Sequence, residues 1–91
     1  LAPEIFVSRT VMTAGESIRL SLSIPEAGHA LLGIYDLSGR EVARLVDGEL
    51  AAGTQSVVWE AARGSAIGSG VYWARLTTAG SNVSQRLIVV H

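Results

Sequence analysis

Residues 17–24 alternate without a break between polar and apolar side chains. The apolar positions hold Ile18, Leu20, Leu22 and Ile24, and the positions between them hold Arg19, Ser21 and Ser23. A period of two residues is that of a β-strand with one buried and one solvated face. Pro25 and Gly28 follow the run and predict its end, because proline cannot donate to a strand ladder and glycine favours turns. The pattern therefore predicts a sheet that buries one of its faces.

Shorter runs of the same kind make up the rest of the chain, and glycine-containing turns separate them. We expect further strands at residues 30–36, 41–47, 55–60, 70–77 and 83–90. A first strand is expected at residues 5–8 or 10–12. Residues 41–45 have a helical turn as an alternative, since short apolar segments do not distinguish the two. Loops are expected at residues 48–53 and 61–69, and a hairpin turn at residues 79–82.

Regular strand spacing, with turn signals and no long segment of helical period, favours an all-β fold. We predict an immunoglobulin-like or fibronectin III-like antiparallel β-sandwich of about seven strands. The 91 residues leave room for one hydrophobic core, so residues 1–91 are expected to form a single domain. Because the chain begins with Leu1 and not with methionine, we expect it to be a module of a larger protein.

Composition excludes several classes of partner and chemistry. A formal net charge of −1 provides no basic surface of the kind that nucleic acids require, so no nucleic-acid partner is expected. The apolar runs are too short to cross a bilayer and no basic amphipathic helix is visible, so membrane insertion is not expected either. The absence of cysteine excludes disulfides, thiolate catalysis and cysteine-ligated metals.

Candidate catalytic and metal-binding residues are scarce. A hydrolytic triad needs a base beside a nucleophile, and the two histidines are His29, expected in a turn before a strand, and His91, the last residue. Asp47, Glu49 and Glu60 lack the dense alternating oxygen donors of a calcium loop, so we interpret them as solvated turn residues. We therefore expect no enzymatic activity, no cofactor and no metal.

Two further motifs have simpler explanations. Residues 64–70 are rich in glycine and serine, but the lysine and hydroxyl residue that a phosphate-binding loop requires do not follow, and a flexible loop is the stronger interpretation. Asn82-Val83-Ser84 is a formal glycosylation sequon, although a turn position already explains its asparagine.

The aromatic residues divide between the core and the surface. Trp59 shares a strand face with Val57 and is expected in the core. If Tyr72 points inward, Trp73 points outward, where an indole could stack on a sugar ring or pack against a neighbouring domain. A sugar site usually combines several coplanar aromatics with polar groups, and only Tyr35 joins Trp73 as a candidate. Carbohydrate is therefore the weaker partner hypothesis.

Two series of motifs run through nearly the whole chain. The first series is residues 22–28, 33–42 and Leu45: a strand that ends in proline, a strand that ends in Tyr-Asp, and a turn that ends in Gly-Arg. The second series is residues 52–53, Val57, Trp59, residues 69–72, Leu76 and residues 86–90. In order and spacing, the chain resembles the immunoglobulin-like module shared by the flagellar hook-capping protein and the C-terminal sorting domains of type IX secretion cargo.

The resemblance implies a β-sandwich that is appended to secreted enzymes and surface proteins. In the sorting family it implies recognition by the outer-membrane secretion machinery, and a secreted or cell-surface location reached through the periplasm. The motif residues have structural roles. Gly39 is expected to have positive φ in the turn, and Gly53 and Gly70 to stand at strand starts where a side chain would crowd. Trp59 and Tyr72 are expected to bury large areas.

The leading hypothesis is a non-catalytic C-terminal sorting or anchoring domain of a secreted bacterial protein. We expect Leu87 and Val89 to hold the final strand in the sandwich, while Arg86, Ile88 and Val90 face outward for recognition. At a sheet edge, the backbone of this strand could also add to another sheet. The alternatives are a passive accessory domain that braces a neighbouring catalytic domain, a carbohydrate-binding module, and a hook-cap domain.

Overall fold

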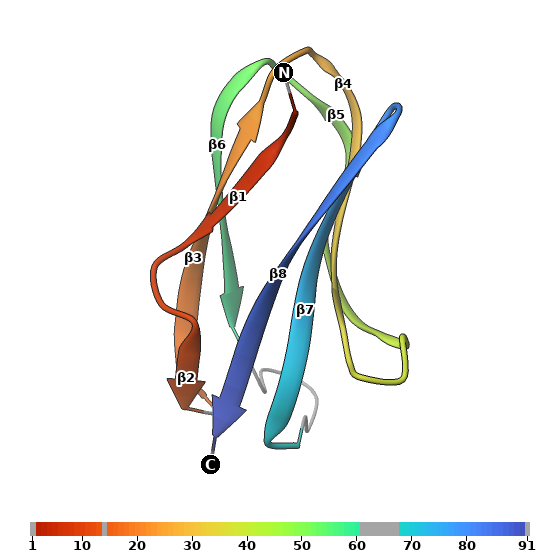
Figure 1. Cartoon of the computed structure of the whole chain (residues 1–91). Coiled ribbons are helices and arrows are strands. Elements are labelled where there is room, and N and C mark those ends of the chain that lie inside the picture. Colours follow the sequence, from red (N-terminus) through yellow and green to blue (C-terminus); the bar gives the residue numbers. More distant parts are fainter. Residues whose placement is uncertain (1, 14, 61–67, 91) are drawn as a thin grey trace.

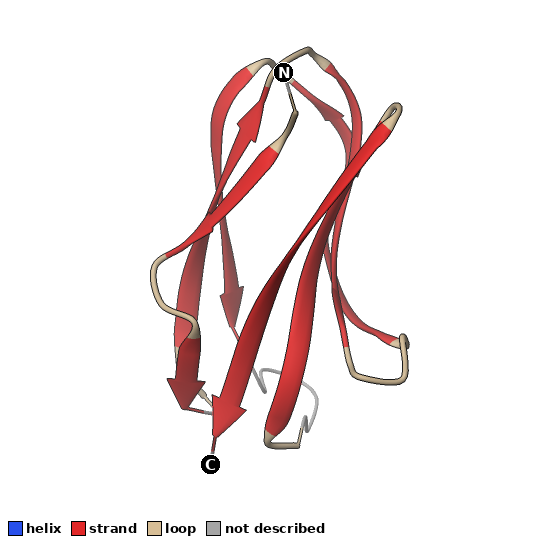
Figure 2. Cartoon of the chain, viewed as in Figure 1, coloured by secondary structure: helices blue, strands red, loops and turns tan. Residues whose placement is uncertain are grey.

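The computed structural model describes residues 2–13, 15–60 and 68–90. These residues form eight strands joined by turns, and no helix occurs among them (Figure 2). In chain order the strands are β1 (Glu4–Val7), β2 (Val11–Thr13), β3 (Ser17–Ile24), β4 (Gly28–Tyr35), β5 (Glu41–Leu50), β6 (Gly53–Glu60), β7 (Gly70–Thr78) and β8 (Ser81–Val90).

Two sheets pack against each other as a sandwich (Figure 1). The smaller sheet has the strand order β1-β3-β6, and the larger sheet has the order β2-β8-β7-β4-β5. The chain crosses between the sheets from β1 to β2, from β2 to β3, from β3 to β4, from β5 to β6 and from β6 to β7, and the two-sheet arrangement is consistent with an immunoglobulin-like sandwich. The prediction of an all-β sandwich is confirmed.

The inward side chains of the two sheets form one hydrophobic core. The alternating pattern of β3 buries all four of its apolar side chains to 4% exposure or less. The larger sheet contributes Met12, Ala30, Leu32, Ile34, Tyr72, Ala74, Leu76, Leu87 and Val89. No polar or charged side chain is buried among the described residues. The fold is therefore stabilised mainly by apolar burial and close packing.

The N-terminal segment belongs to both sheets. β1 pairs antiparallel with β3, and β2 then pairs in parallel with the end of β8. Between them, the Ser8 N–H donates to the Arg19 carbonyl oxygen at 3.0 Å, and the Arg19 N–H donates to Ser8 Oγ at 3.1 Å. Met12, only 1% exposed, anchors β2 in the core. Both positions considered for a first strand are therefore strands, and β2–β8 is a parallel pair in an otherwise antiparallel arrangement of the described strands.

Strand β5 is longer than the sequence indicates, and a helical turn over its first residues is wrong. Residues 48–50, predicted to be a loop, continue β5, where Glu49 lies opposite His29. His29 itself lies within β4 and not in a preceding turn. Pairing between β4 and β5 therefore outweighs the preference of Gly28 and Gly48 for turns.

The glycines in the turns act through their backbone angles. Gly39 has a φ of +88° in the turn after Asp36, as predicted. The prediction that a side chain would crowd at Gly53 and Gly70 is wrong, because a Cβ at either position would meet no atom within 4 Å. Their φ values of +113° and +151° are instead ones that residues with a side chain rarely adopt.

Candidate functional site

The outward side chains of the larger sheet form a continuous face over β8, β7, β4 and β5. Strand register places Trp73 of β7 opposite Arg86 of β8 on one side and opposite Tyr35 of β4 on the other. Tyr35 in turn lies opposite Glu41 of β5. Arg86, Trp73, Tyr35 and Glu41 therefore form one row across the sheet, which we call the central row.

Tyr35 is held in place by its neighbours. A Cβ added to Gly33 would lie 3.0 Å from Cε1 of Tyr35, so the tyrosine ring covers the backbone of this glycine. The guanidinium carbon of Arg75 lies 5.2 Å from the centre of the same ring, within range of a cation–π interaction. The phenol hydroxyl donates to Glu41 Oε2 at 3.4 Å. Trp73, 37% exposed, is the more open aromatic side chain of the row.

Carboxylates dominate the β5 side of this face, where Glu41, Asp47 and Glu49 are exposed. Arg44 bridges two of them: its Nε lies 3.1 Å from Glu41 Oε1, and its Nη1 lies 3.2 Å from Asp47 Oδ2. The hydrogen bond with Glu41 is the main cause that raises the pKa of Arg44 above its ordinary value. Three carboxylates and one guanidinium leave the β5 side with a net negative charge.

The β7 and β8 side of the face is basic. Arg75 and Arg86 are exposed, and neither forms an ion pair with any residue in the part of the chain that the structure describes. The formal charge therefore changes sign across the face, from positive on β7 and β8 to negative on β5. Trp73 and Tyr35 lie between the two halves.

Strand β8 carries the three side chains that were predicted from the sequence to face outward. Arg86 and Val90 are exposed and Ile88 is half-buried, all on the outer face, while Leu87 and Val89 are fully buried. The end of β8 is not an open edge, because β2 pairs with residues 88–90 and the Ile88 N–H donates to the Thr10 carbonyl oxygen at 2.8 Å. Strand addition at this place is therefore blocked, whereas the outward side chains stay accessible.

Exposed apolar side chains gather on the same face. Val11, Leu37, Trp73 and Val90 belong to the larger sheet or its turns, and they are four of the six large apolar side chains exposed among the described residues. Register places Val11 opposite Ile88, and Ile88 opposite Val71. Leu37, which is 73% exposed, lines a shallow depression together with Val71. The face thus combines an apolar band with the central row.

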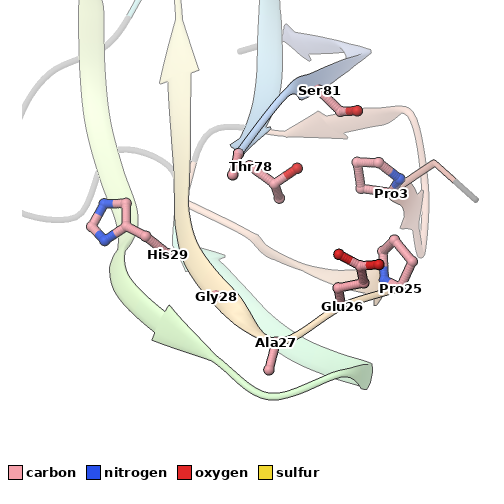
Figure 3. A pocket seen from close by; sticks show the side chains of 9 residues that line it. Pro3, Pro25, Glu26, Ala27, Gly28, His29, Thr78 and Ser81 are labelled. Carbon is pink, nitrogen blue, oxygen red and sulfur yellow. The ribbon is translucent and has the colours of Figure 1, made fainter.

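His29 is the histidine that the structure describes, since His91 lies outside the described residues. A pocket of about 170 Å³ lies where the β3–β4 turn meets the β7–β8 turn, and His29 stands at its rim. The imidazole ring points away from Pro3 and Pro25 (Figure 3). Its Nε2 lies 3.3 Å from Asp47 Oδ1 on β5. Among the described residues, no serine or threonine hydroxyl hydrogen-bonds to His29.

The three candidate calcium ligands are not brought together. Asp47 and Glu49 lie on β5, whereas Glu60 ends β6 in the smaller sheet. All three are strand residues, so the prediction that they lie in turns is wrong. Within residues 2–13, 15–60 and 68–90, no group of three or more histidine, aspartate or glutamate side chains could hold a metal ion. Residues 64–67 of the glycine-rich segment lie outside the described residues. No helix in the described part of the chain is long and apolar enough to cross a membrane.

Asp36 organises the β4–β5 turn. Its Oδ1 accepts hydrogen bonds from the Ser38 hydroxyl at 2.6 Å, from the Ser38 N–H at 3.0 Å and from the Arg40 N–H at 3.0 Å. The hydrogen bond from the Ser38 hydroxyl is the largest cause that lowers the pKa of Asp36, and the hydrogen bond from the Arg40 N–H is the second largest.

Asn82 of the sequon is exposed and lies in β8 opposite Thr77, so the prediction that it lies in a turn is wrong.

Sequence reasoning placed Arg75 on the same strand face as Trp73, but it singled out neither Arg75 nor Glu41 as a candidate functional residue. Arg75 stands two residues after Trp73, so strand parity alone places both on the same side, and that signal was present in the sequence. Glu41 could not be placed beside Tyr35 in the same way. Its position depends on the register between β4 and β5, which contains irregularities between Leu32 and Gly33 and between Ile34 and Tyr35.

No protein-family model matches the chain, and no curated protein matches its sequence. We therefore base the functional proposal on the motif resemblance and on the geometry of the larger sheet.

Proposed function

We propose that this β-sandwich is a non-catalytic C-terminal sorting or anchoring domain of a secreted bacterial protein. The outer-membrane secretion machinery is its recognition partner, and its destination is the cell surface or the exterior, reached through the periplasm. The motif series of residues 22–45 and 52–90 supports this proposal through its resemblance to the sorting family. The structural observation that carries it is the outward display of Arg86, Ile88 and Val90 by a strand that the core holds in place.

Recognition in this proposal uses side chains and not strand addition. Because β2 already pairs with residues 88–90, a partner cannot extend the sheet at that position. Val11 and Val71 flank Ile88 on the two neighbouring strands and enlarge the apolar part of the surface. An apolar centre with a cationic side chain at its rim is the usual composition of a protein–protein interface.

A gain-of-function experiment tests this proposal. Residues 1–91 are fused to the C-terminus of a periplasmic reporter protein in a bacterium that has a type IX secretion system. The expected result is a reporter at the cell surface or in the medium. A matched fusion with Leu20→Asp, which places a charge at a fully buried core position, controls for the need for a folded domain. A reporter that stays in the periplasm with the wild-type domain contradicts the proposal.

A second candidate is a passive domain that braces a neighbouring catalytic domain. The observation in its favour is on the other sheet, where Phe6 and Val58 are 56% and 49% exposed. Packing against a neighbouring domain would cover these two side chains and remove their apolar surface from water. A bracing role predicts that Phe6→Ser with Val58→Ser lowers the melting temperature of the parent protein without changing its location.

A carbohydrate-binding role is weaker. Gly33 and Arg75 both lie against the Tyr35 ring, which leaves Trp73 as the open aromatic surface of the central row. Sugar-binding faces normally offer several such rings together. Retention of the wild-type domain on cellulose, xylan or chitin, lost in Trp73→Ala, would favour this role.

A further inference from the structure

We propose that two copies of this chain associate face to face through the outer surface of the larger sheet. The twofold axis of this dimer runs parallel to the strands and lies between β4 and β7. The inference does not rest on the proposed sorting function, because it follows from the order of side chains across one sheet. Its occupant is a second copy of the same chain, since the face is complementary to itself.

The central row carries the self-complementarity. Across the sheet it reads Arg86, Trp73, Tyr35, Glu41, that is, cation, aromatic, aromatic, anion. A twofold rotation about an axis between β4 and β7 reverses this order in the second copy. Arg86 of each copy then faces Glu41 of the other, and Trp73 of each copy faces Tyr35 of the other. One row thus forms two ion pairs and two aromatic contacts.

The apolar residues beside the central row obey the same symmetry. Val71 of β7 and Leu37 of the β4–β5 turn line one depression at the end of the row. The rotation exchanges the β7 and β4 sides of the face, so Leu37 of one copy is placed over Val71 of the other. Leu37 is 73% exposed in the single chain, and this contact would remove much of its apolar surface from water.

The charged residues have the capacity for these contacts. Glu41 already accepts from Arg44 and from the Tyr35 hydroxyl. A carboxylate has about four lone-pair positions, so a guanidinium from the second copy can still bind. Arg86 forms no ion pair with a described residue, so pairing it breaks no existing contact. Arg75 faces Gly33 of the second copy, which the Tyr35 ring of that copy covers, and the two Arg75 side chains lie on either side of the twofold axis, where their like charge opposes association.

The size of the face predicts a weak dimer. Four strands at a spacing of about 4.8 Å and some six residues along each strand cover roughly 300–400 Å² per copy. The total for two copies, roughly 600–800 Å², is below the lower limit of about 1,200 Å² for stable specific interfaces, which corresponds to transient association. We expect a dissociation constant on the order of 10–1000 µM that increases with salt, because the outer ion pairs are screened. Association would also cover Arg86, and so compete with any partner that recognises this residue.

Sedimentation equilibrium of the isolated chain, from about 10 µM to 1 mM at low salt, tests the proposal. The expected result is a weight-average mass that rises from 9.5 kDa towards twice that value. R86E and E41R should each weaken self-association at least tenfold, because each places like charges in contact at both symmetry-related positions. R19E is the matched control, since Arg19 is exposed and without an ion pair among the described residues, but lies on the smaller sheet. It should leave association unchanged.

An equimolar mixture of R86E and E41R gives the sharpest result. In the mixed dimer both positions hold one cation and one anion, so the mixture should associate about as strongly as the wild type although neither variant does so alone. A monomer at 1 mM overturns the proposal, and it leaves the face open to a different protein or to an acidic glycan. Equal effects of R19E and R86E, or no rescue in the mixture, also overturn it. Reporter secretion does not enter these measurements, so the two proposals can fail separately.

Discussion

Trp59 of the smaller sheet meets Tyr72 of the larger sheet across the core, with ring centres 6.3 Å apart and ring planes inclined by 59°. This tilted geometry is favourable for aromatic pairs. Trp59 is 5% and Tyr72 7% exposed, and the Tyr72 hydroxyl donates to the Gly68 carbonyl oxygen at 2.6 Å. The pair therefore joins the two sheets near the start of β7 and the end of β6.

Trp59→Ala removes one side of this aromatic contact and leaves a cavity between the sheets. We expect a loss of roughly 3–5 kcal/mol in the free energy of unfolding, measured by urea denaturation. Trp73→Ala is the matched control, since it removes the same side chain from the outer face and should cost much less. Equal losses for the two variants would show that Trp59 has no special place in the core.

The predictability of this core differs from strand to strand. The bounds expected for β3 agree with the structure because its alternation is unbroken and Pro25 ends it. β5 was expected to end before Gly48, but pairing with β4 carries it to Leu50. The division of the N-terminal segment between two sheets could not be read from local pattern, since it depends on distant partners in β3 and β8.

On the candidate face, too, local sequence pattern does not determine which residues of different strands become neighbours. Strand parity predicts that Arg86, Ile88 and Val90 share one side of β8, and the burial pattern agrees with it. The central row additionally requires three cross-strand registers, and no local property of the sequence determines these. Sequence reasoning could therefore name the residues of one strand but not their neighbours on the sheet.

Gly39→Ala should destabilise the β4–β5 turn. Its φ of +88° is unfavourable for alanine, so a loss of about 1 kcal/mol is expected in thermal unfolding. Gly48→Ala is the matched control, because φ is not positive at Gly48 and an added Cβ meets no atom within 4 Å. A Gly39→Ala melting temperature equal to that of Gly48→Ala would show that the turn tolerates a side chain.

Asp36→Ala should destabilise the domain at neutral pH, and this effect should disappear in acid. The hydrogen bonds from Ser38 and Arg40 lower the pKa of Asp36 in the folded state below its usual 3.8. Such a group stabilises the fold fully above its unfolded pKa, and the contribution is lost as pH falls through the folded pKa. Melting temperatures of wild type and variant should therefore differ at pH 7, and the difference should shrink as the pH falls below 3.8. A difference that stays constant down to pH 2 contradicts this role.

The central claim is tested most directly by the cellular location of the parent protein after the outward side chains of β8 have been replaced. One variant combines Arg86→Ser, Ile88→Ser and Val90→Ser on the larger sheet. Its matched control combines Arg19→Ser, Phe6→Ser and Val58→Ser on the smaller sheet, which also removes one exposed arginine and two apolar side chains. Thermal unfolding of both purified variants confirms that each is folded. We predict that the first accumulates in the periplasm while the control reaches the cell surface at wild-type levels. Surface delivery of both variants at wild-type levels would contradict recognition through β8.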